Sequence, residues 1–581
     1  MSRIRKQKFL RFRRDFHVKL AMVCGFLCLF GIALFAKLFY LQIVQHEELL
    51  SRSEKQYLQT VKVFYGRGKI LDRNLNELAA NIEVESVYVN PRNIVNKEYT
   101  ARTLASLLAL DGDRTFRKIS SKKQFVWIKR KCDLNETAEL RHLDLPGVGF
   151  ITEHKRFYPK RGLAAAAIGF VGLDNQGLAG IEHAYDSILK GAISLKVIER
   201  DARGKHLGAL GKSPALSKQS SDVALTLDES IQYIAEFHLE AQVKKYNAKG
   251  GMAVVMAPDT GEIYAMAAVP RYNPNSYAAF PARLWKNSIV SSSFEPGSTF
   301  KPIVAAAAIE GGLARPADLF FCENGSYHIG GTRIGEASNH KFGWLSLSDI
   351  IVKSSNIGAV KVAEKLGPAR LYKQIRKFGF GERAGIGMPG ENAGKLRGLP
   401  HWSKRSLASI SFGHEIGATP LQMIAAFAAI ANGGKLVRPF IVKAVMKNGG
   451  IVQSREPRPV RRVISPYTSR QVTEMLKGVV KRGTASQAAV AGFEVAGKTG
   501  TAQKIDPKTR AYSKTAYLSS FIGFVPADAP KLVILVMIDE PEFVYWGGKV
   551  AAPVFRKIAK QTLRYLNVPS REERVFILDR V

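Results

Sequence analysis

A long apolar segment near the N-terminus is the first feature of the hydrophobic pattern. Leu20–Ala36 contains no charged residue, and the apolar run resumes at Leu38–Leu41. If Lys37 extends its ammonium group to the interface, Val18–Val44 can cross a hydrocarbon core roughly 30 Å thick. A cleaved signal peptide would have a shorter apolar region followed by small residues, and Leu38–Gln42 offers no such site. We therefore expect an uncleaved membrane anchor.

The charged residues around this segment predict its orientation. Basic residues stay on the cytoplasmic side of a membrane, so the N-terminus is expected inside and the chain beyond residue 44 outside. Eight basic residues precede or open the span: Arg3, Arg5, Lys6, Lys8, Arg11, Arg13, Arg14 and Lys19.

Residues 45–220 form a charge-rich region broken by Gly and Asn, in which Gly66–Asn74 has the pattern of a turn, a strand and a second turn. No nucleophile–base pair or metal-ligand spacing stands out there, so we interpret the region as a pedestal or docking module. Lys212–Ser221 is polar and rich in turn-forming residues, and it predicts a domain boundary.

The remaining chain predicts strands at both ends and helices between them. Hairpins are expected at 252–267, around the turn 258–261, and at 518–538. Helices are expected over 231–243 and from 553 to about 566, and most of 296–485 has a helical pattern. A strand from Phe493 to Ala496 should continue into Gly497–Thr501. The pattern predicts an α+β fold, with one antiparallel sheet closed by strands from both ends of the domain and covered by helices.

The net charge of the chain bears on its binding partners more than the rest of its composition does. The 581 residues carry a net charge of +37, which usually points to nucleic acid, but the predicted anchor places most of that charge outside the membrane. Anionic lipid headgroups, pyrophosphate-bearing lipids and acidic wall polymers are possible counterparts there, although a basic surface can also exist without any ligand. Only two of the four cysteines, Cys132 and Cys322, lie beyond the span, and they do not suggest a disulfide framework.

The segment Phe294–Pro302 contains the main candidate for chemistry. A Pro-Gly turn precedes Ser298, and the apolar run Ile303–Ile309 follows it, so Ser298 and Lys301 should lie on one face in the first turn of a buried helix. A lysine that is partly buried there has a lowered pKa and can act as a base for the serine hydroxyl. The positive end of the helix favours an oxyanion.

Ser-x-x-Lys alone is a weak signal, because it also occurs at Ser120–Lys123 and Ser338–Lys341, in polar surroundings typical of a solvated surface. Two later segments change the assessment. The catalytic motifs of β-lactamases and penicillin-binding proteins occur in the order Ser-x-x-Lys, Ser-Asp-Asn, Lys-Thr-Gly. This chain has the same order, with Ser354-Ser355-Asn356 as the second motif and Lys498-Thr499-Gly500 as the third.

With these three motifs in order, the chain resembles the penicillin-binding protein family, specifically its class B high-molecular-weight, FtsI-like type. We find no glycosyltransferase domain ahead of the pedestal, which distinguishes it from class A. Further segments are similar to family motifs: Arg67–Gly68 with Asp72–Asn74, Arg156–Pro159, Gly177–Glu182, Ser411–Gly413, Thr419–Gln422 and Tyr545–Gly548. The resemblance implies a mixed α/β pedestal and a transpeptidase domain with a five-stranded antiparallel sheet flanked by helices.

The resemblance also implies D,D-transpeptidation of peptidoglycan stem peptides through an acyl-enzyme, by a serine-type D-Ala-D-Ala transpeptidase/carboxypeptidase. Ser298 would be the nucleophile, Lys301 its base, and Ser354 a proton relay to the leaving amine near Lys498. Asn356 would bind the substrate amide.

Other residues would then bind the substrate. Thr499 and Thr501 would hold its carboxylate, Gly500 would permit its close approach, and the backbone N–H groups of Ser298 and Thr501 would form the oxyanion hole. No metal and no cofactor are expected.

The implied domains and partners complete the hypothesis. Stem peptides and the lipid-linked precursor are the expected substrates, β-lactams are covalent inhibitors, and a lipid-dependent glycosyltransferase with other divisome proteins would be partners; nucleic acid is not expected. The protein would be a single-pass inner-membrane protein with a periplasmic catalytic domain. Five segments are expected: cytoplasmic tail 1–17, anchor 18–44, pedestal 45–220, transpeptidase domain 221–570 and C-terminal tail 571–581.

Several alternatives remain open at this point. Septal cell division is favoured, but an elongation-type or sporulation-type transpeptidase fits the same motifs. A penicillin-sensing receptor belongs to another class and would carry several spans and a cytoplasmic effector. A β-lactamase would leave the pedestal unexplained, and a scaffold with a dead site conflicts with intact motifs.

Overall fold

The chain forms two compact units. The computed structural model describes residues 2–64, 66–190, 193–200, 206–209, 220–506 and 508–571. Most of the predicted boundary at Lys212–Ser221 and nearly all of the predicted tail at 571–581 lie outside these ranges.

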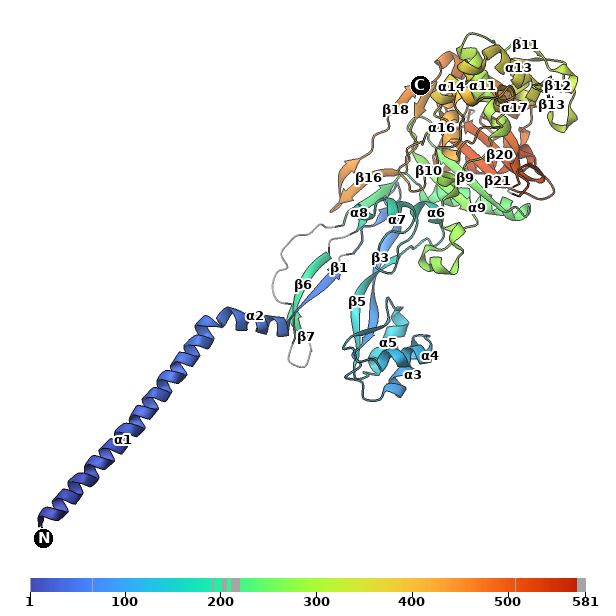
Figure 1. Cartoon of the computed structure of the whole chain (residues 1–581). Coiled ribbons are helices and arrows are strands. Elements are labelled where there is room, and N and C mark those ends of the chain that lie inside the picture. The colour runs from blue at the N-terminus through green and yellow to red at the C-terminus, as the bar shows by residue number, and fades with distance from the viewer. Residues whose placement is uncertain are drawn as a thin grey trace, which may run out of the picture. The chain divides into compact units, whose positions relative to one another are not determined.

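The N-terminal unit consists of helices followed by a small sheet (Figure 1). Helix α1 (Ser2–Phe39) leads through a π-helical turn (Tyr40–Val44) into α2 (His46–Tyr57). Strand β1 (Leu58–Phe64) pairs antiparallel with β6 (Ile193–Arg200), which pairs with β7 (His206–Ala209). Within α1 and the turn, Phe16–Val44 is long and apolar enough to cross a membrane, and it includes the predicted span Val18–Val44.

The second unit contains a seven-stranded sheet that joins distant parts of the sequence. Strand β8 lies parallel to β2, and the other pairings are antiparallel. In spatial order the path is β17 (Gly450–Ser454), β16 (Val442–Lys447), β8 (Asp222–Leu225), β2 (Ile70–Leu71), β3 (Glu77–Val89) and β4 (Val126–Lys129), with β5 (Val148–Phe157) also on β3. This sheet therefore connects the predicted pedestal to strands that follow position 220.

A second, smaller core lies at the far end of β3 and β5. It is formed by apolar residues of the strands and of three helices, α3 (Lys97–Leu107), α4 (Gly112–Ile119) and α5 (Leu134–His142). The Asp111 side chain accepts a hydrogen bond from the Arg114 N–H and so caps α4. Cys132 is buried in this core as a free thiol, as expected.

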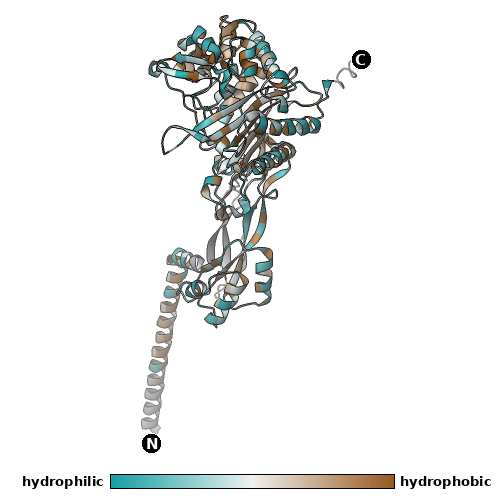
Figure 2. Cartoon of the chain, turned by 90° about the vertical axis from the view of Figure 1, so that its right-hand side faces the viewer, coloured by the Kyte–Doolittle hydropathy of each residue, from teal (hydrophilic) through white to brown (hydrophobic). Residues whose placement is uncertain are grey.

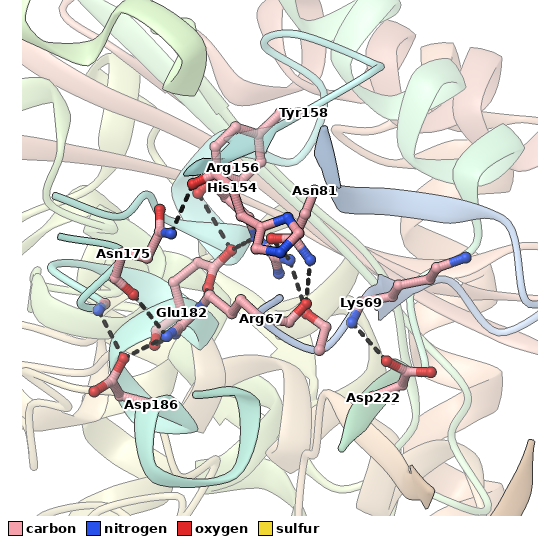
Figure 3. A network of polar contacts seen from close by, with 12 residues as sticks. Arg67, Lys69, Asn81, His154, Arg156, Tyr158, Asn175, Glu182, Asp186 and Asp222 are labelled. Atoms are coloured by element: carbon pink, nitrogen blue, oxygen red, sulfur yellow. Dashed lines mark hydrogen bonds and ion pairs between the residues drawn. The ribbon is translucent and has the colours of Figure 1, made fainter. Parts of the chain in front are cut away.

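A buried ion-pair network holds the start of this unit together (Figure 3). Glu182 lies on the short helix α7 (Gly180–Ala184) and accepts hydrogen bonds on its two oxygens from Arg67 Nε at 2.5 Å and Arg156 Nε at 2.6 Å. Arg67 also donates to Asp186 at 2.6 Å. Two guanidinium groups thus face two carboxylates, so the buried charges are balanced, and residues 67, 156 and 182 are fixed relative to one another.

The central element of the C-terminal part is a five-stranded antiparallel sheet, as expected. Its strands are, in spatial order, β10 (Ile263–Val269), β9 (Gly250–Met256), β21 (Leu532–Asp539), β20 (Tyr512–Val525) and β19 (Ala496–Ile505). Helices α9 (Glu229–Lys245) and α19 (Ala552–Tyr565) pack against it, as does α16 (Pro420–Ala431). Figure 2 shows apolar colouring inside this part and hydrophilic residues along its outer helices.

The segment 296–485 contributes most of the remaining helices and several short strands. The helices that concern the site are α11 (Lys301–Glu310), α12 (Leu347–Lys353), α13 (Asn356–Leu366), α15 (Ser406–Ser411) and α17 (Pro466–Arg482). Smaller elements of the second unit are α6 (Ala165–Ile168), α8 (Asp186–Leu189), α10 (Ser288–Ser291), α14 (Pro368–Lys377), α18 (Gly547–Val550), β11 (Leu319–Phe321), β12 (Ser326–Ile329), β13 (Thr332–Gly335), β14 (Trp344–Ser346), β15 (Lys435–Val437) and β18 (Pro459–Arg462).

Both predicted hairpins and the two flanking helices are confirmed, with ends that differ by a few residues. Two expectations need correction. The helical segment 296–485 also contains strands, because its short β-ribbons pair with each other or extend the sheet of the pedestal. The strand predicted from Phe493 begins only at Ala496, since Val490–Phe493 closes a turn with a backbone hydrogen bond of 3.1 Å.

Candidate active site

Ser298 lies in a 3₁₀ turn, Gly297–Phe300, that leads directly into α11. The sequence placed Ser298 inside the first α-helical turn, so this is a local correction. Side chains three residues apart eclipse one another in a 3₁₀ helix, so the turn brings Ser298 and Lys301 to the same side. Ser298 is partly exposed, whereas Lys301 is 1% exposed. The nucleophile candidate is therefore partly open to solvent while its neighbour is enclosed.

The ammonium group of Lys301 connects the first two motifs. Its Nζ donates hydrogen bonds to Asn356 Oδ1 at 2.7 Å and to the backbone oxygen of Ser354 at 2.6 Å, and it lies 3.3 Å from Ser354 Oγ. Burial lowers the pKa of Lys301 from 10.5 to about 7, although the charge of Glu336 offsets part of this effect. A lysine with this pKa is neutral in about half of the molecules at pH 7, so it can accept a proton.

Ser354 occupies a strained position between two helices. It ends α12 with a φ of +61°, a left-handed conformation that residues other than glycine seldom adopt. The next residue, Ser355, caps the start of α13, and its hydroxyl accepts a hydrogen bond from the Gly358 N–H at 2.9 Å. The short connection turns Ser354 Oγ and the Asn356 amide toward Lys301. The strained backbone of Ser354 is therefore part of the geometry that brings these groups together.

Lys498 lies on the edge strand β19 and completes the cluster. It is 0% exposed, and its Nζ donates to Ser354 Oγ at 2.9 Å. Burial and then the positive charge of Lys301 hold the pKa of Lys498 well below its ordinary value. Ser354 Oγ is thus within hydrogen-bonding distance of both lysine amines, which suits a hydroxyl that passes a proton between them.

Strand β19 approaches the Ser298 turn closely because Gly500 has no side chain. A Cβ at Gly500 would lie 2.4 Å from Ser520 Oγ and 2.9 Å from Thr299 Cγ2. Thr501 follows on the strand, and its hydroxyl accepts a hydrogen bond from the Gly547 N–H at 3.2 Å. The glycine thus permits an edge strand to lie directly beside the turn that carries the nucleophile candidate.

Contacts around Thr499 come partly from residues that the sequence did not indicate. Its hydroxyl is 2.8 Å from that of Thr484, which belongs to no recognised motif. Gly548 belongs to the Tyr545–Gly548 segment noted in the sequence, and a Cβ there would lie 2.1 Å from Thr484 O. The pair of glycines in that segment was the available signal for this close packing.

Glu336 is the important residue that sequence reasoning missed. It is 7% exposed, and its carboxylate accepts hydrogen bonds from Ser355 Oγ at 2.5 Å and from the Asn356 and Ile357 N–H groups at 2.6 and 3.2 Å. These contacts fix the start of α13, where a negative charge is favourable. A single glutamate directly after a short strand, twenty positions before Asn356, belongs to no motif that could have revealed it.

The two other Ser-x-x-Lys segments take no part in the site. Ser120, Lys123, Ser338 and Lys341 are all exposed, as their polar surroundings predicted. Among the described residues, no group of three or more His, Cys, Asp or Glu side chains could hold a metal ion.

Family comparisons agree with this geometry. Residues 251–560 match the model of the penicillin binding protein transpeptidase domain, and residues 64–225 match that of the penicillin-binding protein dimerisation domain. The chain belongs to the penicillin-binding protein transpeptidase family. The serine, the two lysines and the Ser-Ser-Asn segment described above all lie within the transpeptidase match.

Individual relatives cover almost the whole chain. Stage V sporulation protein D of Bacillus subtilis (strain 168) is 35% identical over 95% of this chain and 86% of its own length. Peptidoglycan D,D-transpeptidase FtsI of Escherichia coli (strain K12) is 30% identical over 95% of this chain and 92% of its own. The crystal structure of penicillin binding protein 3 from Mycobacterium tuberculosis, complexed with aztreonam, is 31% identical with a TM-score of 0.68, covering 88% of this chain and 98% of that one.

Proposed function

We propose that this penicillin-binding protein is a peptidoglycan D,D-transpeptidase that acts through a Ser298 acyl-enzyme. The observation that carries the proposal is the convergence of three motifs distant in the sequence: Lys301 Nζ contacts Asn356 Oδ1 at 2.7 Å, and Lys498 Nζ contacts Ser354 Oγ at 2.9 Å. The activity named for the FtsI relative is the same.

In the acylation step, Ser298 Oγ attacks the carbonyl carbon of the penultimate D-alanine, and neutral Lys301 takes the hydroxyl proton. The backbone N–H groups of Ser298 and Thr501 stabilise the oxyanion, each contributing about 3 kcal/mol. The C–N bond then breaks, and Ser354 delivers a proton, supplied through Lys498, to the departing amine of the terminal D-alanine.

In the second step an amine from a neighbouring stem peptide attacks the acyl-enzyme and the proton path reverses. If water attacks instead, the same site acts as a carboxypeptidase. Thr499 and Thr501 hold the substrate carboxylate beside Lys498, and Gly500 keeps the strand close to it. Asn356 uses the second hydrogen of its Nδ2 for the substrate amide, since the first is donated to Gly335 O at 3.0 Å.

The cellular setting follows from the same hypothesis. Residues 1–17 would be cytoplasmic, 18–44 would span the inner membrane, and the pedestal (45–220) and transpeptidase domain (221–570) would lie outside. Division at the septum with a lipid-dependent glycosyltransferase is the preferred role. Filamentous cells after depletion would support that role, round cells would favour elongation, and defects restricted to spores would favour sporulation.

Protease added to spheroplasts should digest the chain beyond residue 44, and full protection would contradict the proposed topology.

Fluorescent penicillin tests the chemistry directly. The full chain in detergent should be labelled covalently, with the adduct at Ser298, while Ser298→Ala should abolish labelling without lowering the melting temperature. Undiminished labelling of the Ala variant would overturn the assignment. Purified stem peptides with an amine acceptor then separate cross-linking from hydrolysis, since only the former yields a dimeric product.

A further inference from the structure

A groove with a volume of about 300 Å³ lies between two connecting segments of the C-terminal part, and none of its lining residues belongs to a catalytic motif. One segment leads from β15 to β16 and supplies Arg438 and Phe440. The other leads from β17 to β18 and supplies Arg455, Glu456 and Arg458. The Arg455 N–H donates to the carbonyl of Lys443 in β16 at 2.9 Å, so the second segment is held against that strand beside the groove.

The charge of this region is strongly one-sided. Residues 435–462 contain eight Lys and Arg residues and one acidic residue, Glu456. That glutamate lies 3.9 Å from Arg458, whose side chain is 84% exposed, so it forms only a loose ion pair. Within residues 66–190, 220–506 and 508–571, neither Arg438 nor Arg455 forms an ion pair. The groove therefore presents three guanidinium groups against a single carboxylate.

Arg455 is the most informative of the three because it is partly buried. Its guanidinium carbon lies 5.1 Å from the centre of the Phe440 ring, which supports one side of the group. Burial and the neighbouring Arg438 both lower the pKa of Arg455, and Tyr185 is the partner that opposes them. A guanidinium remains charged in proteins, so a partly buried cation lies here without an anionic partner among the described residues.

We propose that this groove binds an oxyanion of the phosphate class. Planar guanidinium groups pair bidentately with phosphate oxygens, and a phosphate group would supply the counter-charge that Arg438 and Arg455 lack. The groove shares no residue with the Ser298 site, so binding there is separate from acylation. Two sources offer this chemistry outside a membrane: a lipid-linked pyrophosphate and a phosphodiester polymer.

Calorimetry with the full chain in a neutral detergent tests the proposal, with sodium pyrophosphate as the probe at low salt. Binding is expected, and it should weaken as salt is added. Arg455→Gln and Arg438→Gln should each weaken it at least about tenfold, as expected for the loss of a charge-assisted contact. The control removes two exposed arginines elsewhere, Arg370→Gln with Arg556→Gln, and should leave the affinity unchanged.

Two results would overturn the proposal: no binding at millimolar pyrophosphate, or equal weakening in the control. Penicillin labelling of Ser298 should be unchanged in all groove variants, which shows that they are folded and that the site is separate. If Arg455→Gln does not fold, the exposed Arg458→Gln provides the same comparison. Farnesyl pyrophosphate and a glycerol phosphate oligomer then distinguish the sources, because preferential binding of the former indicates a lipid pyrophosphate and of the latter a polymer.

Discussion

Replacement of Glu336 by glutamine should change the pH dependence of acylation in a direction that the structure specifies. Glu336 belongs to none of the catalytic motifs. Its negative charge raises the pKa of Lys301, while burial lowers that pKa by a larger amount. Its carboxylate also anchors the N–H groups of Asn356 and Ile357. The substitution keeps the shape of the side chain and removes the charge. The midpoint of the pH profile then reports the effect of the charge on Lys301, and the plateau reports the anchoring of Asn356.

The expected pH dependence of acylation in the wild-type protein is the reference for this variant. With a pKa of about 7, half of the Lys301 side chains are neutral at pH 7, whereas an ordinary lysine at 10.5 would be neutral in about 3 of 10,000 molecules. Burial therefore increases the fraction of active base by roughly a thousandfold. Acylation should rise with pH to a plateau, with its midpoint near 7, and at pH 6 it should reach about one tenth of the plateau.

The variant should combine a lower midpoint with a lower plateau. Without the carboxylate, the protonated form of Lys301 loses a favourable interaction, so the midpoint moves toward acid. The other charged or titratable groups near Lys301, namely Lys498 and His414, are unchanged by the substitution. An amide offers one acceptor oxygen where the carboxylate used two, so the start of α13 loses about 1–3 kcal/mol and Asn356 is held less firmly.

Second-order rate constants for a fluorescent penicillin, measured from pH 5 to 10, provide the assay. Glu364→Gln is the matched control, because it removes the same charge from α13, where Glu364 accepts a hydrogen bond from Tyr327 OH at 2.8 Å. The control should keep the wild-type midpoint. An unchanged or alkaline midpoint in Glu336→Gln, with the variant folded, would refute the assigned influence of Glu336 on Lys301.

Three further substitutions test other parts of the structure. Ser354→Gly and Ser354→Ala should both slow acylation, but the glycine variant should be more stable by about 1 kcal/mol in thermal unfolding, since only alanine keeps the left-handed strain; equal stabilities would contradict this. Gly500→Ala should reduce acylation about 100-fold because its Cβ would lie 2.4 Å from Ser520 Oγ, whereas Gly112→Ala, in open space, should have no effect. Glu182→Gln should lower the stability of the full chain by about 3–5 kcal/mol by leaving buried guanidinium charge uncompensated, and an unchanged melting temperature would exclude that role.

The residues of the candidate site could be selected from sequence because each belongs to a short segment with a recognisable local pattern. Ser298 and Lys301 are adjacent on any helical turn, and Lys498 precedes a glycine that a close-packed strand requires. Their convergence depends on the tertiary fold, and only the order of the motifs suggested it. The left-handed backbone of Ser354 had no signal, because it arises from joining α12 to α13 without a glycine.

The fold was predictable where the hydrophobic pattern is regular. Each strand of the two hairpins contains an apolar run, so both hairpins were found within a few residues. The strand β16 was missed because it lies in a basic segment and gains its stability by pairing with β8, more than two hundred positions earlier. Non-local pairing of this kind leaves no periodicity in the sequence around it.

Neither of the two buried lysines of the site, Lys301 and Lys498, forms an ion pair with a carboxylate among the described residues. The pKa that a catalytic base needs explains this arrangement. A carboxylate bonded directly to Lys301 would hold its pKa near that of an ordinary lysine and leave it protonated at neutral pH. The structure instead surrounds the amine with neutral oxygen acceptors, and Glu336 accepts its hydrogen bonds from Ser355 Oγ and the Asn356 N–H. This arrangement costs stability wherever the lysine is charged. Because the folded pKa of Lys301 is lowered to about 7 from 10.5, the unfolded chain binds more protons between these values, and the protein gains stability as the pH rises through that range. Reactivity at neutral pH and maximal stability therefore make opposite demands on the same side chain.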